Sequence, residues 1–452
     1  MDLLSLEAGA WACLFLPLFL MGGVLVAIKT RMFPLRGLPL LRKELAEDRD
    51  KGDGLGSGQA ASLSLAATIG TGNIIGTAQA IAMGGPGAVA WMWLAALIGM
   101  PIKYAEIFLG QRYPGGAIRY VTLALGPIAG TCYAALGALS ALAVGNMAQV
   151  NGTVTAIAAA IGAGGKLCRF ILGLSLCACL WRVLAGGARR AGKAAELLVP
   201  AMTLIFLFFS FAVIVAHGEQ ILPTLRQIVQ GALSPRSALG AACGIQTRET
   251  LQWGLRRGAF SNEAGLGTAS IVHSAVRAKD AAVHALCGVF EVMVDTWVVC
   301  TVTALTILCS GIPIPYGSLP GPELYRDALA SVWGQRTASL VLSASLALFS
   351  FTTVLGSFVT GRRCFSALCG ERVGDIYLGL SIACALLGSV IPIGPIWRAS
   401  DSIDLALAVP ALIALVVFSG EIGRSARERS HAEKNARYPE RPSSSIRRPS
   451  VE

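Results

Sequence analysis

Long apolar runs recur along the whole chain, and short polar segments rich in Gly, Pro, Lys and Arg separate them. A helix needs about 20 apolar residues to cross a hydrocarbon layer of about 30 Å. The runs that reach this length predict the spans 9–28, 59–83, 87–110, 125–160, 170–187, 195–216, 238–274, 281–309, 337–361, 375–392 and 402–420. The pattern therefore predicts an all-α polytopic membrane protein with about eleven transmembrane helices. Span 125–160 is too long for one upright helix, so we expect it to tilt or to extend beyond the bilayer.

Composition supports lipid as the solvent of this fold. Charged residues make up 14% of the chain and hydrophobic residues 54%, whereas soluble domains carry about 25% charged residues. The first apolar run is long and follows Asp2 and Glu7 rather than basic residues. We therefore expect it to stay as a helix and not to act as a cleaved signal peptide.

The loops predict an orientation, because cytoplasmic loops carry an excess of Lys and Arg. Segment 29–54 holds seven basic residues, and further basic residues occur in alternate loops and after residue 422. This bias predicts an outside N-terminus and a cytoplasmic C-terminus in a bacterial inner membrane. It also explains the net charge of +11 by contact with anionic lipid, so no nucleic-acid partner is expected. Residues 423–452, rich in Arg, Ser and Pro, are expected to form a disordered basic cytoplasmic tail.

Cysteines and histidines do not form a recognisable pattern. Most of the 12 cysteines lie inside apolar spans, where they behave as small hydrophobic residues, and the four histidines are scattered. The sequence therefore predicts neither a disulfide framework nor a metal site. Neither a Ser/His/Asp set nor an HExxH pattern occurs in the spans, so an enzyme is not expected.

Two spans are interrupted by glycine and polar residues. The first interruption is Thr68–Gly76, with the sequence TIGTGNIIG. Each of its three glycines weakens a helix by about 1 kcal/mol relative to alanine. Unwound backbone at membrane depth is tolerated where it lines a cavity, and the N-terminus of the following half-helix favours an anion. Close packing of small residues is the alternative interpretation.

The second interruption is Gly258–Gly267, with the sequence GAFSNEAGLG. It brings Ser261, Asn262 and Glu263 together within a span, and a carboxylate in a membrane indicates a functional site. An ordinary loop between two shorter helices is the alternative.

Other polar residues fall in mid-span. Gln149 lies in span 125–160. Thr352 and Thr353 offer hydroxyls that could coordinate Na⁺, although a threonine in a membrane helix more often bonds its own backbone. Glu291 and Asp295 share a helical face. They could relay protons or pair with an arginine or a backbone donor.

Taken together, several segments resemble the alanine/glycine:cation symporter family, which includes sodium:alanine symporters. They are ATIGTGNIIGTAQAIAMGGPGAVAWMW (67–93), KYAE (103–106), GNMAQVN (145–151), AELLVPAM (195–202), RRGAFSNEAGLGTA (256–269), DTWVVCTVTALTIL (295–308) and AVPALIALVVFSGEI (408–422). The resemblance implies a LeuT-like fold of two five-helix inverted repeats, preceded by one extra N-terminal helix. The two interruptions would then begin the two repeats. The expected organisation is an N-terminal helix and basic loop (1–54), a ten-helix transport core (55–422) and the tail.

The resemblance also implies a substrate site and a sodium site. The backbone of residues 70–72 would receive the substrate carboxylate, Gln149 and Asn262 would bind the zwitterion, and Phe260 would cover a small side chain. The implied substrate-binding residues are Gly70, Thr71, Gly72, Asn73, Gln149, Phe260, Ser261, Asn262 and Glu263. The implied sodium ligands are Ala66, Ile69, Thr352 and Thr353.

The function implied is secondary active symport of Na⁺ with a small neutral amino acid, alanine or glycine, by alternating access. In one rival, protons replace sodium and Glu263, Asp295 or Lys193 carries them. In another, the protein is a membrane sensor that no longer transports. Ser357 stands where the family usually has an aromatic residue, and Arg362 where it has an acid. These departures leave the identity of the small zwitterion open, and the sequence leaves the oligomeric state open.

Overall fold

The computed structural model describes residues 11–41, 55–233, 247–276, 278–370 and 374–437. Within these ranges every regular element is a helix. The first half contains η1 (Trp11–Phe15), α2 (Leu16–Lys29), α3 (Phe33–Arg36), α5 (Ser57–Thr68), α6 (Thr71–Gly84), α7 (Ala88–Arg112), α8 (Ala117–Leu125), α9 (Pro127–Leu142), η2 (Ala143–Ala148), α10 (Gln149–Ala160), α11 (Lys166–Leu184), α12 (Gly187–Ala216), η3 (Gly218–Gln220) and α13 (Ile221–Leu233). The second half contains α15 (Thr247–Asn262), α16 (Thr268–His273), α17 (Ala281–His284), α18 (Leu286–Val292), η4 (Met293–Cys300), α19 (Thr301–Cys309), α20 (Glu323–Cys369), α21 (Gly374–Val390) and α22 (Ile393–Arg437).

Length and composition mark many of these helices as membrane-spanning. Among the described residues, seven helices are long and apolar enough to cross a bilayer, and Cys13–Lys29 and Gly374–Val390 are shorter apolar helices. The all-helical membrane architecture is thus confirmed, while the count of eleven stays a prediction. Residues 238–246 of the predicted span 238–274 lie outside the described residues.

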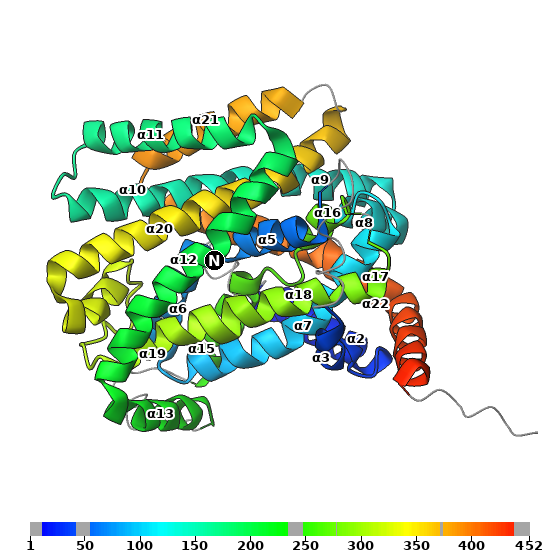
Figure 1. Cartoon of the computed structure of the whole chain (residues 1–452), viewed down its shortest axis with the longest axis horizontal. Helices are drawn as coiled ribbons and strands as arrows, with labels where there is room; N and C mark the ends of the chain where they lie inside the picture. Colours follow the sequence, from blue (N-terminus) through cyan, green and yellow to red (C-terminus); the bar gives the residue numbers. More distant parts are fainter. Residues whose placement is uncertain (1–10, 42–54, 234–246, 277, 371–373, 438–452) are drawn as a thin grey trace, which may run out of the picture.

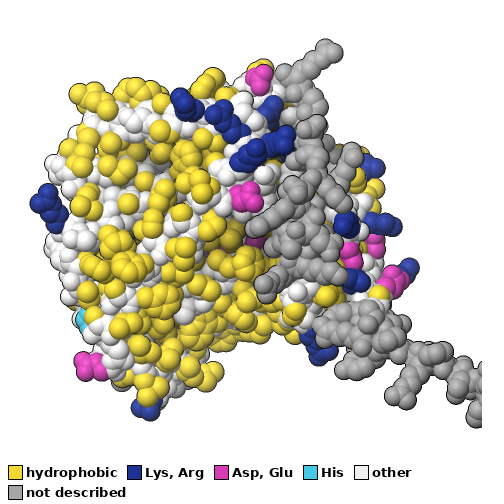
Figure 2. Space-filling model, in the orientation of Figure 1, with side chains coloured by type: hydrophobic (Ala, Val, Ile, Leu, Met, Phe, Trp, Pro, Cys, Tyr) yellow, Lys and Arg dark blue, Asp and Glu magenta, His cyan; other side chains and the backbone are white. Residues whose placement is uncertain are grey.

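The outer surface is apolar, as a lipid-facing surface requires. Figure 2 shows hydrophobic side chains over most of the face in view, with few charged groups among them. On α12, Leu204, Phe208 and Val215 are each more than 60% exposed. Their spacing places them on one side of the helix. Large apolar side chains left this exposed are stable in contact with lipid rather than water.

The broken helices lie inside the bundle. In Figure 1, α5 and α6 lie between a group formed by α10, α11, α20 and α21 and a group formed by α7, α15 and α18. Helix α5 packs against α12, α18 and α20, and α6 packs against α15. Polar groups at the breaks therefore face other helices and not lipid.

Two long helices contain π-helical turns close to polar side chains. Predicted span 125–160 runs without a break from Pro127 to Ala160, and η2 interrupts its α-helical geometry just before Gln149. Between α18 and α19, η4 carries Asp295. Turns of this kind are frequent at functional sites because they redirect side chains and leave backbone groups available. Here the side-chain amide nitrogen of Gln149 donates to the backbone carbonyl oxygen of Val144 in η2, at 3.3 Å.

The structure moves the boundary of the predicted disordered tail. Helix α22 continues to Arg437 and so includes the first part of residues 423–452. Arg429 forms an ion pair with Asp280 at 2.8 Å. This contact with the segment before α17 helps to hold the end of α22 against the bundle. The tail beyond Arg437 lies outside the described residues.

Candidate functional site

The first helix break is shorter than the sequence predicts. Only Ile69 and Gly70 separate α5 from α6, and both have extended backbone angles. The rest of the predicted interruption, from Thr71 to Gly76, is helical. The reason is a local cap: the backbone N–H of Gly70 donates to the side-chain oxygen of Asn73 at 2.9 Å. This bond fixes the turn that starts α6.

Gln149 on α10 faces the start of α6. Its side-chain oxygen accepts hydrogen bonds from the backbone N–H of Thr71 at 3.1 Å and from the hydroxyl of Thr71 at 2.9 Å. The partial positive charge of a helix N-terminus favours an oxygen ligand at this position. A Cβ atom added to Gly72 would meet no atom within 4 Å. At the start of α6, the side-chain oxygen of Gln149 therefore contacts Thr71, and open space adjoins Gly72.

Thr353 on α20 reaches the break from the opposite repeat. Its hydroxyl oxygen lies 3.1 Å from the carbonyl oxygen of Ile69 and 2.8 Å from that of Phe349 on its own helix. A Cβ atom at Gly70 would lie 2.8 Å from this hydroxyl and 3.1 Å from the side-chain oxygen of Gln149. Glycine at position 70 thus permits α10, α20 and the break to meet.

The two threonines differ in what they contact. The Thr352 hydroxyl lies 3.0 Å from the carbonyl oxygens of Leu348 and Phe349 and 3.2 Å from the sulfur of Met202. These contacts engage Thr352 with its own helix and with α12, whereas Thr353 contacts the break. The predicted ligand Ala66 is buried in the last turn of α5. Carbonyls in the last turn of a helix lack an N–H donor from the helix itself.

The second break lies between α15 and α16. Glu263, Gly265 and Gly267 have positive φ angles of 52°, 97° and 79°. Two buried charged residues of α7 hold this segment. Glu106 accepts from the backbone N–H of Gly265 at 2.7 Å and of Gly267 at 2.9 Å.

Lys103, one helical turn before Glu106, donates to the carbonyl oxygen of Asn262 at 3.0 Å. Both side chains are buried. They satisfy the backbone groups that unwinding leaves open, which is what a non-helical segment inside a membrane requires. Both residues belong to the KYAE segment of the family resemblance, which implied no role for them. Two charged residues within an apolar span are a sequence signal from which a role could have been predicted.

Asp295 on η4 joins the two breaks. Its carboxylate accepts from the side-chain amide of Asn73 at 2.5 Å and from the hydroxyl of Ser261 at 2.9 Å. Thr296 donates to the same carboxylate at 2.7 Å. The Asn262 amide nitrogen lies 3.4 Å from the Thr296 hydroxyl. Asn73 of the first broken helix and Ser261 of the second, both predicted substrate ligands, therefore bind the same buried carboxylate.

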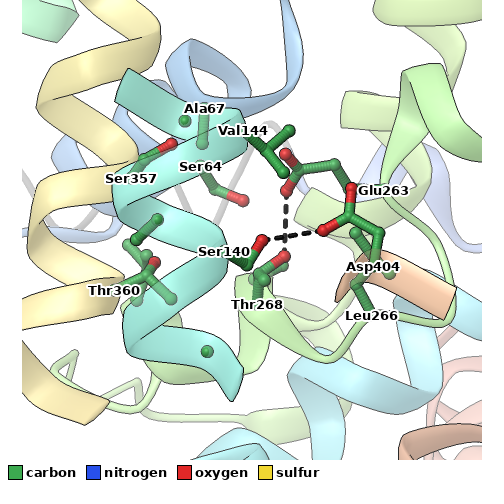
Figure 3. A pocket seen from close by; sticks show the side chains of 15 residues that line it. Ser64, Ala67, Ser140, Val144, Glu263, Leu266, Thr268, Ser357, Thr360 and Asp404 are labelled. Atoms are coloured by element: carbon green, nitrogen blue, oxygen red, sulfur yellow. Dashed lines mark hydrogen bonds between the residues drawn. The ribbon is translucent and has the colours of Figure 1, made fainter. Parts of the chain in front are cut away.

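The remaining predicted residues lie to the side of this junction. Phe260 is partly buried, and its ring centroid lies 5.8 Å from the guanidinium carbon of Arg257. Glu263 lines a cavity together with residues of α5, α9, α20 and α22 (Figure 3). Its carboxylate accepts from the hydroxyl of Thr268 at 2.9 Å.

Asp404 of α22 faces the same cavity and accepts from the hydroxyl of Ser140 on α9 at 2.7 Å. Figure 3 shows the side chains of Glu263 and Asp404 directed toward one space, with Ser357 and Thr360 on its other side. Neither Asp404 nor Ser140 was among the residues predicted from the sequence. A carboxylate within span 402–420 was the available signal.

Comparison with known proteins identifies the family of this chain. The model of the sodium:alanine symporter family matches residues 3–442. The chain is 31% identical to the sodium/alanine symporter AgcS of Methanococcus maripaludis, over 96% of this chain and 99% of that protein. It is 31% identical to the probable sodium/glutamine symporter GlnT of Bacillus subtilis, over 95% and 90%. It is 30% identical to the putative sodium/proton-dependent alanine carrier protein YrbD of the same organism, over 91% and 90%.

A solved structure shows the fold. The crystal structure of MhsT in complex with L-phenylalanine superposes with a TM-score of 0.60 at 16% identity, covering 80% of this chain and 88% of that one. This likeness supports the LeuT-like arrangement, in which each five-helix repeat begins with a broken helix. The chain belongs to the sodium:alanine symporter family and is a multi-pass, cation-coupled amino acid symporter with a LeuT-like fold.

Proposed function

We propose that this protein couples Na⁺ entry to the uptake of a small neutral amino acid, alanine or glycine, across a bacterial inner membrane. The observation that carries the proposal is the contact between the Thr353 hydroxyl and the carbonyl oxygen of Ile69, 3.1 Å apart. It supports the proposal because it brings an oxygen atom of α20 close to an oxygen atom of the first break. Sodium and alanine both appear in the names of similar proteins from two organisms.

The proposed ion site consists of the carbonyls of Ala66 and Ile69 with the Thr353 hydroxyl. Hard cations prefer such oxygen ligands. Thr352 is a fourth proposed ligand, and it has to turn its hydroxyl away from the carbonyls of Leu348 and Phe349 to serve. The Thr353 hydroxyl also bonds the carbonyl of Phe349, but it already lies beside the carbonyl of Ile69, so we assign it the larger contribution.

The proposed substrate site lies at the start of α6. A substrate carboxylate would bind the N–H groups of residues 70–72, taking over the Thr71 bonds that Gln149 now accepts. Gln149 and Asn262 would then bind the zwitterion, and Phe260 would cover the side chain. The open space beside Gly72 fits a small amino acid. Asn73 and Ser261 support this site through Asp295, and Glu263 faces the adjoining cavity.

Coupling follows from shared contacts. An added Cβ at Gly70 would touch both Thr353 and Gln149. The proposed ion site and the proposed substrate site therefore both adjoin Gly70. Sodium that orders Ile69 also orders the start of α6. Each ligand therefore raises the affinity for the other by the same factor, and together they favour the closed states of the transport cycle.

Proton coupling is the second candidate. Asp295 is a buried carboxylate and Glu263 a partly buried one, and a proton carrier in a membrane needs a carboxylate in such surroundings. Lys193, the third residue considered for this role, is exposed on α12 and lacks such surroundings. In this candidate uptake follows a proton gradient without sodium.

Uptake into proteoliposomes tests the proposal. Labelled alanine and glycine are supplied with and without an inward Na⁺ gradient, at fixed pH, to wild type, Thr353→Ala and Thr353→Ser. We expect sodium-driven accumulation in wild type, loss in Thr353→Ala and retention in Thr353→Ser, which keeps the hydroxyl. Loss of one oxygen ligand that contributes about 1.4 kcal/mol would weaken the apparent Na⁺ affinity about tenfold.

Thr306→Ala is the matched control, because the Thr306 hydroxyl bonds the carbonyl of Val302 on its own helix. It should transport like wild type. Accumulation driven by a pH gradient and indifferent to both Na⁺ and Thr353→Ala would contradict sodium coupling. Sodium-driven uptake of another amino acid, without alanine or glycine uptake, would contradict the substrate assignment.

A further inference from the structure

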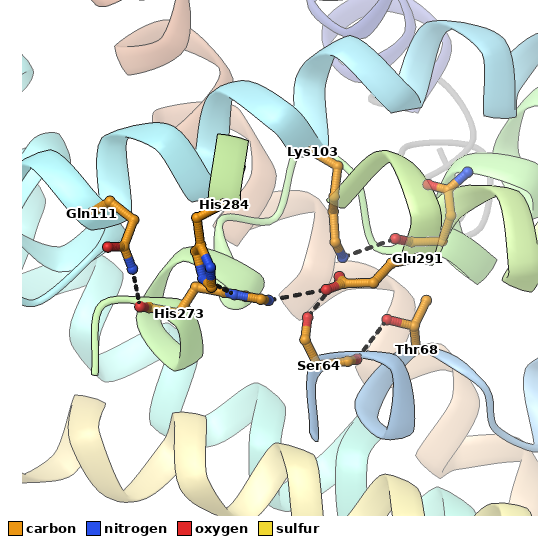
Figure 4. A network of polar contacts seen from close by, with 8 residues as sticks. Ser64, Thr68, Lys103, Gln111, His273, His284 and Glu291 are labelled. Atoms are coloured by element: carbon orange, nitrogen blue, oxygen red, sulfur yellow. Dashed lines mark hydrogen bonds and ion pairs between the residues drawn. The ribbon is translucent and has the colours of Figure 1, made fainter. Parts of the chain in front are cut away.

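Three side chains with metal-binding atoms, all from the segment between residues 273 and 287, meet at one end of the bundle. His273 ends α16, His284 ends α17 and Cys287 lies in the first turn of α18. Each is buried, and one ligand atom from each lies within 4.8 Å of the others. Nδ1 of His273 is 2.9 Å from Nε2 of His284 (Figure 4). The fold therefore brings these two histidines together, although the sequence predicts no metal site.

The geometry is close to that of a tetrahedral metal site. Zinc binds histidine nitrogen at 2.0–2.1 Å and cysteine sulfur at about 2.3 Å, so two nitrogen ligands of one zinc ion lie about 3.3 Å apart. The two imidazole nitrogens need to separate by only a few tenths of an ångström to reach this distance. A pair of imidazoles with a thiolate suits zinc or cobalt rather than the hard ions Na⁺ or Mg²⁺.

A carboxylate orients the first ligand. Nε2 of His273 lies 2.9 Å from an oxygen of Glu291, whose other oxygen accepts from the Ser64 hydroxyl at 2.7 Å. Gln111 donates to the backbone carbonyl of His273. Metal-binding histidines commonly have a carboxylate on the ring nitrogen opposite the metal. Glu291 occupies that position and leaves Nδ1 of His273 on the side of His284 and Cys287.

The second histidine is not fully engaged by the protein. Nδ1 of His284 is buried without a hydrogen-bond partner among the described residues. Because Nε2 is the nitrogen that faces His273, this Nδ1 atom lies on the other side of the ring and is not one of the proposed ligand atoms.

A cavity adjoins the third ligand. Cys287 is among the residues that line a cavity of about 390 Å³, which is also bordered by Gln59, Glu196 and Phe290. None of the described residues that line this cavity is a proposed substrate ligand, and Cys287 itself is buried.

We propose that His273, His284 and Cys287 bind one divalent transition-metal ion of the zinc class, with Glu291 as the outer residue that positions His273. The occupied site would join α16, α17 and α18, and through Glu291 and Ser64 it would also hold α5. This site is separate from the proposed sodium and substrate ligands. Metal binding can therefore be tested whether or not the transport proposal holds.

Cobalt absorption spectroscopy on the full-length protein, purified in detergent with any affinity tag removed, tests the proposal. We expect one Co²⁺ per chain and a thiolate-to-cobalt charge-transfer band that Zn²⁺ removes by competition. Cys287→Ser should abolish the band. Glu291→Gln should keep the band but weaken binding about 10–100-fold, the effect of losing an outer partner. His284→Gln should weaken it further.

Two matched variants serve as controls, because they change the same residue types elsewhere. His217→Gln lies at the end of α12, and Cys177→Ser lies within α11. Both should keep the band and the affinity of wild type. The wild-type spectrum does not depend on any variant folding, so a wild type without a thiolate band overturns the proposal. A band unchanged in Cys287→Ser, or lost in Cys177→Ser, overturns it as well.

Discussion

The side-chain amide of Asn73 donates to the carboxylate of Asp295 over 2.5 Å and so links the first broken helix to η4. Ser261 of the second broken helix donates to the other oxygen of the same carboxylate. Two helices that begin the two repeats are thus tied to one buried acceptor. If either broken helix moves, Asp295 has to move with it or the hydrogen bond to that helix is lost.

Replacing Asp295 by asparagine should destabilise the protein and impair transport. The substituted amide presents an N–H group where the carboxylate accepts from Asn73, Ser261 and Thr296. A buried hydrogen-bonding group left unsatisfied costs about 1–3 kcal/mol. Thermal unfolding in detergent should show a lower Tm than wild type. An unchanged Tm with normal uptake would contradict the role of Asp295 as the joint between the breaks.

Gly70→Ala should abolish coupled uptake while leaving the protein folded. The new methyl would approach the Thr353 hydroxyl to 2.8 Å and the Gln149 oxygen to 3.1 Å, so both side chains have to retreat from the break. Gly72→Ala is the comparison, because its methyl meets nothing within 4 Å. We expect Gly72→Ala to fold normally and to raise the KM for alanine more than for glycine. Uptake by Gly70→Ala at the wild-type rate would contradict the proposed sites.

Glu106→Ala should loosen the second break. It removes the acceptor of the backbone N–H groups of Gly265 and Gly267, and each lost partner costs about 1–3 kcal/mol in a buried site. Hydrogen exchange of residues 263–267 should therefore quicken. Glu106→Gln keeps a side-chain oxygen and should show a smaller effect. Equal exchange in Glu106→Ala and wild type would show that the segment is held by other contacts.

Zinc should slow amino acid uptake in wild-type proteoliposomes. An ion that joins α16 to α18, and through Glu291 to Ser64 of α5, resists movement of the half-helices on that side of the breaks. His284→Gln should transport in zinc at the rate it shows without zinc, whereas His217→Gln should be inhibited like wild type. Equal inhibition of both histidine variants would place the inhibitory ion elsewhere.

The membrane class, the approximate spans and the two interruptions follow from the sequence alone. They depend on local properties: an apolar run of about 20 residues crosses lipid whatever surrounds it, and clustered glycines weaken a helix wherever they occur. Motifs such as GTGNI and SNEAG carried the family assignment for the same reason, because each is a short contiguous pattern.

Tertiary structure decided which polar groups meet. Thr352 and Thr353 are neighbours with identical side chains, yet only the Thr353 hydroxyl contacts Ile69, because the face that α20 turns toward α5 depends on packing. Lys103 and Glu106 satisfy a break about 160 residues away in the chain. His273 and His284 become partners through the turn between α16 and α17. Sequence specifies where helices can form and break, whereas the partners of a buried polar group come from other helices, and their positions are fixed only when the whole bundle packs.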